Sequence, residues 1–107
     1  MKGRVALLLP ALAWPVGCRG QASPADCQSM TEHYLDLAVK ESPGAATMSS
    51  AQIAAVREVE RGLKRAEPSY RLVQDHCEAL TRAEASCAID ATTTRAWEAC
   101  VHRPDAR

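Results

Sequence analysis

Cysteine is the residue type in this chain with the widest range of possible chemistry. The 107 residues include five cysteines and three histidines. Cysteine and histidine at close spacing can bind a metal ion. Two cysteines separated by two other residues can exchange disulfides, and a thiolate beside an imidazole can act as a nucleophile. The spacing of the cysteines and histidines decides which of these sites is possible. The cysteines are Cys18, Cys27, Cys77, Cys87 and Cys100.

The spacing fits none of these three kinds of site. Zinc sites usually contain C-x2-C or H-x3-H pairs, disulfide exchange uses C-x-x-C, and none of these pairs occurs in the chain. His76 and Cys77 are adjacent, but neighbours in a helix diverge by about 100° and cannot form a thiolate–imidazole pair. His33 and His76 each fall at the edge of an apolar helix face, where a boundary histidine is expected. We therefore predict no catalytic residue, no metal site, no cofactor and no enzymatic activity.

The four downstream cysteines, Cys27, Cys77, Cys87 and Cys100, instead predict two structural disulfides, since an even set in a small exported domain usually pairs. Aromatic residues are only 4% of the chain and Phe is absent, so the core is thin and covalent links are expected to matter. In the loop-entropy model, a bridge that closes about 50 residues contributes about 4 kcal/mol, and one that closes about 14 residues contributes about 3 kcal/mol. Four cysteines allow three pairings, and the sequence leaves the pairing open.

The N-terminal residues are typical of an export signal. A short basic start at residues 1–4 precedes an apolar run from Val5 to Trp14, which is too short for a membrane span of about 20 residues. The sequence Trp-Pro-Val-Gly-Cys that ends at Cys18 then resembles the lipobox of bacterial lipoproteins, in which a small residue immediately precedes a cysteine. The resemblance implies that residues 1–17 are removed as a signal peptide and that Cys18 is acylated.

A second interpretation of the same region is ordinary signal peptidase cleavage after Ala22. Gly20-Gln21-Ala22 is a small-x-small site, and a cut there would discard Cys18 and release a soluble secreted or periplasmic protein, such as an effector or inhibitor. Under the lipoprotein interpretation, residues 18–22 are a lipidated cysteine and a short tether. Arg19 stands where some bacteria place the Asp that retains lipoproteins in the inner membrane, which favours the outer membrane of the cell envelope.

The charge excludes nucleic acid as an expected partner. Basic and acidic residues number 13 each, and removal of Lys2 and Arg4 with the signal leaves a net charge of about −2. The expected partners are therefore the membrane, through the lipid anchor, and an unknown protein of the envelope.

Helical periodicity runs through the rest of the chain. Ser23 followed by Pro24 predicts a helix start, and Ser42-Pro43-Gly44 ends that helix. A capping box at Ser49 predicts a second helix that ends before Pro68. The buried side of the second helix is expected to consist of Ile53, Val56, Val59 and Leu63.

A third helix is expected to begin at Ser69. A capping box at Thr81 favours a break there, and the alternative is one uninterrupted helix to about Ala91. An uninterrupted helix carries Cys87 about 15 Å beyond Cys77, which favours the bridges Cys27–Cys77 and Cys87–Cys100. A break makes all three pairings reachable.

A short last helix from Arg95 to Val101 is expected to bury Trp97 and Cys100. Tyr34, Tyr70 and Trp97 are expected in the core with their polar ends near water. No segment alternates with the strand period, so the predicted fold class is all-α: a small disulfide-linked bundle of three to five short helices over residues 23–102, followed by a frayed tail at 103–107. The expected function is that of a helical protein–protein interaction module in an unknown process.

Overall fold

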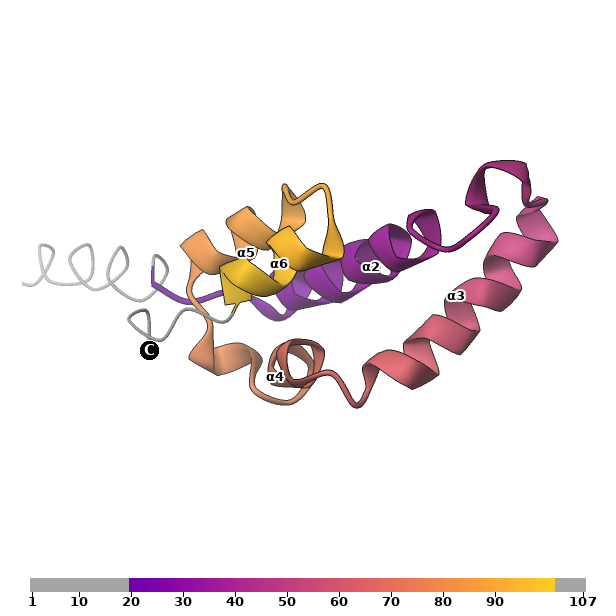
Figure 1. Ribbon diagram of the computed structural model, residues 1–107. Helices are drawn as coiled ribbons and strands as arrows, with labels where there is room; N and C mark the ends of the chain where they lie inside the picture. Colours follow the sequence, from indigo (N-terminus) through magenta and orange to yellow (C-terminus); the bar gives the residue numbers. More distant parts are fainter. Residues whose placement is uncertain (1–19, 102–107) are drawn as a thin grey trace, which may run out of the picture.

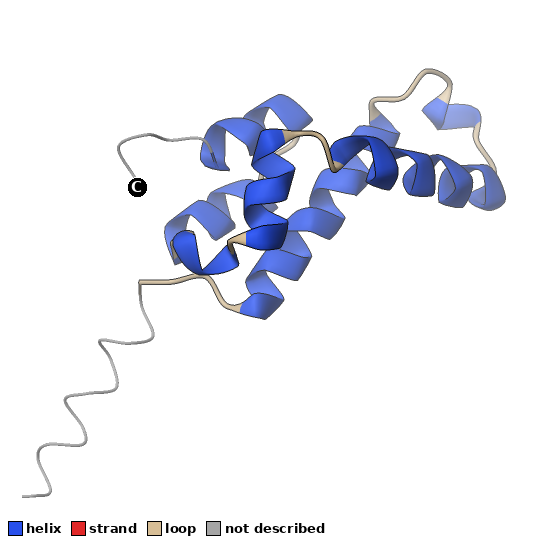
Figure 2. Cartoon of the chain, turned by 90° about the horizontal axis from the view of Figure 1, so that it is seen from below, coloured by secondary structure: helices blue, strands red, loops and turns tan. Residues whose placement is uncertain are grey.

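The computed structural model describes residues 20–101, which form helices arranged around one long central helix (Figure 1). The α-helices are α2 (Pro24–Lys40), α3 (Ser50–Lys64), α4 (Pro68–Asp75), α5 (Arg82–Ile89) and α6 (Thr94–Val101). Two short 3-10 helices, η1 (Ala45–Thr47) and η2 (Cys77–Ala79), lie in the connections. Figure 2 shows helices joined by loops, with no strand among the described residues. The predicted all-α, disulfide-linked bundle is confirmed.

Helix α2 is the element against which the other helices lie. It contacts α3, α4, α5 and α6. Its start follows the prediction, because the Ser23 hydroxyl accepts a hydrogen bond from the Asp26 N–H at 3.0 Å, and the Asp26 carboxylate accepts one from the Ser23 N–H at 2.9 Å. The hydrogen bond from the Ser23 backbone also holds the pKa of Asp26 below its ordinary value. Its buried residues are Cys27, Met30, Thr31, Tyr34, Leu35, Leu37, Ala38 and Val39.

Three aromatic side chains form the centre of the core. Tyr34, Tyr70 and Trp97 have no exposed surface, and the Tyr34 ring centroid lies 4.2 Å from that of Trp97 and 5.7 Å from that of Tyr70. The Trp97 Nε1–H donates to the Met30 carbonyl at 3.0 Å, and the Tyr34 hydroxyl donates to the Glu98 carboxylate at 2.5 Å. Burial and this carboxylate raise the pKa of Tyr34. The prediction that these residues belong to the core is confirmed, but the prediction that their polar ends lie near water is wrong, because all three side chains are fully buried.

The chain between α4 and α5 breaks twice. The first break follows Asp75, where His76 leaves helical geometry with φ −135° and ψ 50°. The second is at Thr81, whose hydroxyl accepts from the Glu84 N–H at 3.0 Å while the Glu84 carboxylate accepts from the Thr81 N–H at 2.9 Å. The predicted capping box at Thr81 is confirmed and the uninterrupted helix is wrong. No proline or glycine marks the earlier break in the sequence.

The segment before α2 is part of the fold, although the sequence suggested a tether there. The Ala22 N–H donates to the Leu80 carbonyl at 3.0 Å, and the Arg82 N–H donates to the Gly20 carbonyl at 3.2 Å. These bonds flank an isolated antiparallel bridge between Gln21 and Thr81. Ala22 is buried in the core. The expected signal at 1–17, Cys18 and the tail at 103–107 lie outside the described residues.

Helix α3 departs most from the prediction. None of its residues is buried, and Ile53, Val59 and Leu63 are 39%, 61% and 62% exposed. Val56 is half-buried. The prediction that these four residues form a buried side is therefore wrong, because α3 is held to α2 by a different, charged side.

Replacing Thr81 with Ala should lower the free energy of unfolding by about 1 kcal/mol, because the N-terminal N–H groups of α5 lose their side-chain acceptor. Urea unfolding followed by circular dichroism measures this. The matched control is Thr92→Ala, since Thr92 is exposed in the loop before α6. Equal stabilities for the two variants would contradict the capping role.

Candidate functional site

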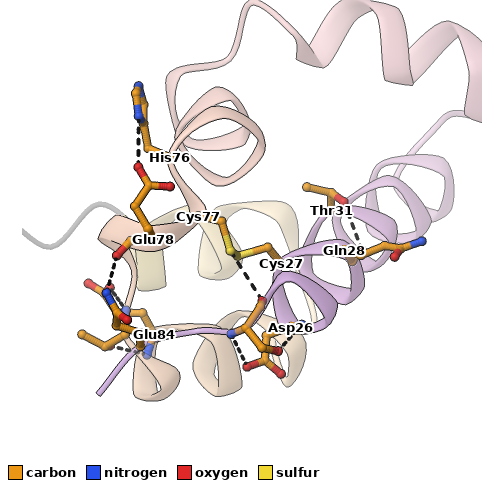
Figure 3. Close-up of a disulfide and its surroundings, with 11 residues drawn as sticks. Asp26, Cys27, Gln28, Thr31, His76, Cys77, Glu78 and Glu84 are labelled. Carbon is orange, nitrogen blue, oxygen red and sulfur yellow. Dashed lines mark hydrogen bonds and ion pairs between the residues drawn. A yellow bond between two sulfur atoms is a disulfide. The ribbon is translucent and has the colours of Figure 1, made fainter. Parts of the chain in front are cut away.

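The first candidate site is the pair of disulfides. Cys27 is bonded to Cys77 with a Cα–Cα distance of 6.1 Å, and Cys87 to Cys100 with a distance of 5.7 Å. Both distances are usual for disulfides. The first bridge joins α2 to η2, as Figure 3 shows, and the second joins α5 to α6. This is the pairing expected for an uninterrupted helix, and it forms even though the chain breaks at Thr81.

The position of η2 accounts for this pairing. The break after Asp75 turns the chain so that Cys77 lies against the first turn of α2, with its Sγ 3.5 Å from the Ser23 carbonyl oxygen. The Leu80 carbonyl then accepts the hydrogen bond from the Ala22 N–H, which fixes the start of α5 at the same end of α2. Cys87 is left facing α6, the helix that contains Cys100.

The cysteines between residues 20 and 101 are thus not available as thiolates. A disulfide sulfur is neither a nucleophile of the thiolate kind nor a ligand for zinc. In the same range of residues, no group of three or more His, Cys, Asp or Glu side chains could hold a metal ion. The disulfides therefore stabilise the fold and offer no reactive group.

The two described histidines have ordinary structural contacts. His33 is half-buried, and its Nε2 lies 2.6 Å from the Ala91 carbonyl oxygen, to which it donates. This bond links α2 to the loop between α5 and α6. His76 is exposed, with its Nδ1 3.6 Å from the Glu78 carboxylate. His33 is the boundary residue that the sequence predicted, whereas His76 lies fully on the surface; His102 lies outside the described residues.

The second candidate site is an ion-pair cluster between α2 and α3. The Arg57 guanidinium donates to the carboxylates of Glu32 and Asp36, and also to the Glu32 carbonyl at 3.2 Å. Arg61 adds a contact of 3.6 Å to the Glu32 carboxylate. The hydrogen bond from Arg57 lowers the pKa of Glu32. The pair therefore contributes stability at neutral pH, and that contribution is lost as the pH falls through the lowered pKa of Glu32.

This cluster sets the rotation of α3 about its axis. At 100° per residue, Arg57 and Arg61 lie on one side of the helix, and Val56, Val59 and Leu63 lie more than 90° away from them. With the arginines bound to α2, the apolar side is turned outward. We call Val56, Val59 and Leu63 the apolar stripe of α3.

The apolar stripe is the third candidate site, and it has the form of a helix-binding surface. Its members are spaced at i, i+3 and i+7, the pattern by which helices recognise one another. Single exposed apolar residues are normal on protein surfaces, but a row of them on one helix face marks a contact site. No other large hydrophobic residues between 20 and 101 are as exposed as Val59 and Leu63.

Gly62 borders the apolar stripe, and no contact within the domain requires a glycine at this position. A Cβ placed on Gly62 would meet no atom within 4 Å. Glycine inside a helix costs about 1 kcal/mol relative to alanine. Ala55 lies on the same border, two turns earlier along α3. The border of small residues leaves room for another helix to approach closely.

The sequence contains a signal for this arrangement. Glu32 and Asp36 are four residues apart on α2, and Arg57 and Arg61 are four residues apart on α3. Matching i, i+4 pairs of opposite charge predict two helices that meet through their charged sides. The apolar periodicity alone predicts Ile53, Val56, Val59 and Leu63 as a buried side.

The lipidation site expected at Cys18 lies outside the described residues. Gly20, two positions later, is the first described residue and belongs to the docked segment before α2. Within residues 20–101, none of the helices has the length and apolar character that a membrane span requires.

Removing the Cys27–Cys77 bridge should destabilise the domain more than removing the Cys87–Cys100 bridge, because the sequence separations are 50 and 13 residues. The loop-entropy model gives losses of about 4 and about 3 kcal/mol for the two double Cys→Ala variants. Each pair includes one cysteine that is 6% exposed. Of their partners, Cys77 is half-buried against the core and Cys87 is exposed, so the loss of packing acts in the same direction as the loop entropy. Urea unfolding of the two variants measures the difference, and the reverse order of stabilities would contradict it.

Replacing Arg57 with Ala should loosen α3 without unfolding the core. The expected cost is about 1 kcal/mol or less, since the pairs are partly exposed. Limited digestion with thermolysin, which cuts before apolar residues, should become faster at Val59 and Leu63, and 1 M salt should speed the same cuts in the unmodified protein.

The control for this experiment is Arg71→Ala, because Arg71 is exposed on α4. Faster cutting in both variants, or in neither, would show that the ion pairs do not hold α3 in place.

Comparison of this chain with protein-family models, with curated proteins and with solved structures finds no match.

Proposed function

We propose that this chain is a small lipid-anchored protein of the bacterial cell envelope, attached through Cys18 and binding another protein through the apolar stripe of α3. The anchoring proposal rests on the lipobox-like sequence before Cys18 together with the docking of residues 20–22. The binding proposal rests on the outward rotation of α3. The two parts are tested separately.

The docking of residues 20–22 is the structural observation that favours cleavage before Cys18 over cleavage after Ala22. A cut after Ala22 would remove the acceptor of the Arg82 N–H and the donor to the Leu80 carbonyl. It would also uncover the part of the core that Ala22 covers. A cut before Cys18 leaves these contacts intact, so this is the cleavage that the fold favours.

The size of this effect is large for a domain with a thin core. Each lost hydrogen bond costs about 0.5–1.5 kcal/mol, against a total stability of about 5 kcal/mol for a small domain. The buried alanine adds to the loss. Cleavage after Ala22 would therefore produce a mature protein with a considerably weaker fold.

The position of the anchor also suits a binding role for α3. Gly20 lies at one end of α2, whereas the turn into α3 lies at the other end (Figure 1). Helix α2 has 17 residues and is about 25 Å long. With Cys18 in the membrane, the far end of the domain would be held away from the bilayer, where proteins can reach it.

Intact mass spectrometry of the mature protein, expressed in a bacterial envelope, tests the anchoring proposal. The expected product begins at an acylated Cys18, and Cys18→Ser should leave an unacylated precursor that takes up no labelled fatty acid. Cys27→Ser, which removes a cysteine of the folded domain, is the control and should still be acylated. A mature protein that begins at Ser23 would contradict the proposal and favour a soluble secreted protein.

The effect of residues 20–22 on stability can be measured without the lipid. A purified protein that begins at Gly20 should be more stable than one that begins at Ser23 by about 1–3 kcal/mol in urea unfolding. Equal stabilities would remove the structural argument for cleavage before Cys18.

A further inference from the structure

We infer that the partner of the apolar stripe is a second copy of this chain, with the two α3 helices paired antiparallel about a two-fold axis beside Val59. The inference rests on the proposed function, because it names the partner of the same surface. It is carried by the distribution of charge along α3, by the small residues that border the stripe, and by the contacts that already engage the α3 arginines.

Charge is confined to one half of α3. The segment 49–56 has no charged residue, whereas the segment 57–65 has six. In an antiparallel pair, the uncharged half of each helix lies beside the charged half of the other. In a parallel pair, the charged halves would lie side by side, with four basic residues in each. The charge pattern and the opposed helix dipoles therefore both favour the antiparallel arrangement. The six residues are Arg57, Glu58, Glu60, Arg61, Lys64 and Arg65.

The apolar stripe is self-complementary in that arrangement. A two-fold axis beside Val59 places Val56 of one copy beside Leu63 of the other, so each apolar residue meets an apolar residue. The same axis places Ala55 beside Gly62 of the second copy. Helices that meet through such small residues can approach to about 8 Å. In the pair, the absence of a side chain at Gly62 would allow this close approach. Within one copy a Cβ at Gly62 would meet nothing within 4 Å, so the glycine is not needed there.

A lipid surface fits the apolar stripe less well. Helices that lie on membranes usually combine aromatic anchors with basic side chains that are free to meet anionic lipid. Helix α3 has no aromatic residue, and Arg57 and Arg61 are already bound to Glu32 and Asp36. The segment before α2, which leads to the proposed anchor, also lies at the end of α2 away from the turn into α3 (Figure 1).

The pairing is expected to be weak in solution and effective on a membrane. Helix α3 has 15 residues. Two helices of that length bury less surface against each other than the roughly 1,600 Å² that stable protein complexes bury. Anchoring both copies through Cys18 would raise their effective concentration, which strengthens a weak contact without new interactions. The dimer should therefore depend on both the stripe and the anchor.

Site-specific photo-crosslinking of the full chain in a bacterial envelope tests this inference. A photoreactive residue at position 59 should give a crosslinked product of twice the mass of the mature chain. The same residue at position 99, which is exposed on α6, is the control and should give little of it. Adding Val59→Glu to a chain with the photoreactive residue at position 55 should reduce the dimer about tenfold or more, because two carboxylates would meet at the axis. An unchanged circular dichroism spectrum would show that the fold is intact, as expected for a side chain 61% exposed.

The possible results separate the two proposals. A dimer at position 59 that weakens when Cys18→Ser abolishes acylation supports both the pairing and the anchor. An acylated protein that gives no more dimer at position 59 than at position 99 overturns the pairing and leaves the anchor standing. A crosslink to a different protein or to lipid also overturns the pairing. A dimer in a protein that begins at Ser23 and is not acylated overturns the anchor and leaves the pairing standing.

Discussion

The contact between Trp97 and Tyr34 is the interaction on which the rest of the structure depends. Trp97 on α6 and Tyr34 on α2 are both fully buried, with ring centroids 4.2 Å apart. Each ring directs its polar atom to a partner on the other helix: Trp97 donates to Met30, and Tyr34 donates to Glu98. A chain with so few aromatic residues has little else of this size to bury. The position of α6 on α2 is therefore fixed here, and the two disulfides hold the neighbouring segments around this contact.

Helix α3 lies outside the core because its charged side, rather than its apolar side, contacts α2. The core uses residues from α2, α4, α5 and α6 together with Ala22 and Leu80. Helix α3 is joined to α2 by Arg57 and Arg61, whose ion pairs with Glu32 and Asp36 are partly exposed. The Lys64 Nζ also lies 5.7 Å from the centroid of the Tyr34 ring. Partly exposed pairs contribute little free energy, but they select one rotation of the helix. The rotation that they select leaves the apolar stripe available to a partner.

Most of the fold could be predicted from local sequence signals. The capping boxes at Ser23, Ser49 and Thr81 each depend on residues three positions apart, and all three form. The end of α4 at Asp75 could not be predicted in the same way, because it is set by the tertiary position of Cys77 against α2. The docking of residues 20–22 could not be predicted either, because it is made by backbone hydrogen bonds, which do not depend on particular side chains.

The candidate site was partly visible in the sequence. Periodicity predicts Ile53, Val56, Val59 and Leu63 as the buried side of a helix, but periodicity does not distinguish a side turned to the core from a side turned away from it. The pairing of the cysteines was likewise open until the position of η2 was known. Hydrogen exchange of a monomeric protein that begins at Gly20 tests the central claim most directly, which is that α3 lies outside the core. Amides of α3 should exchange much faster than those of α2 around Tyr34, whereas equal protection of the two helices would contradict the account.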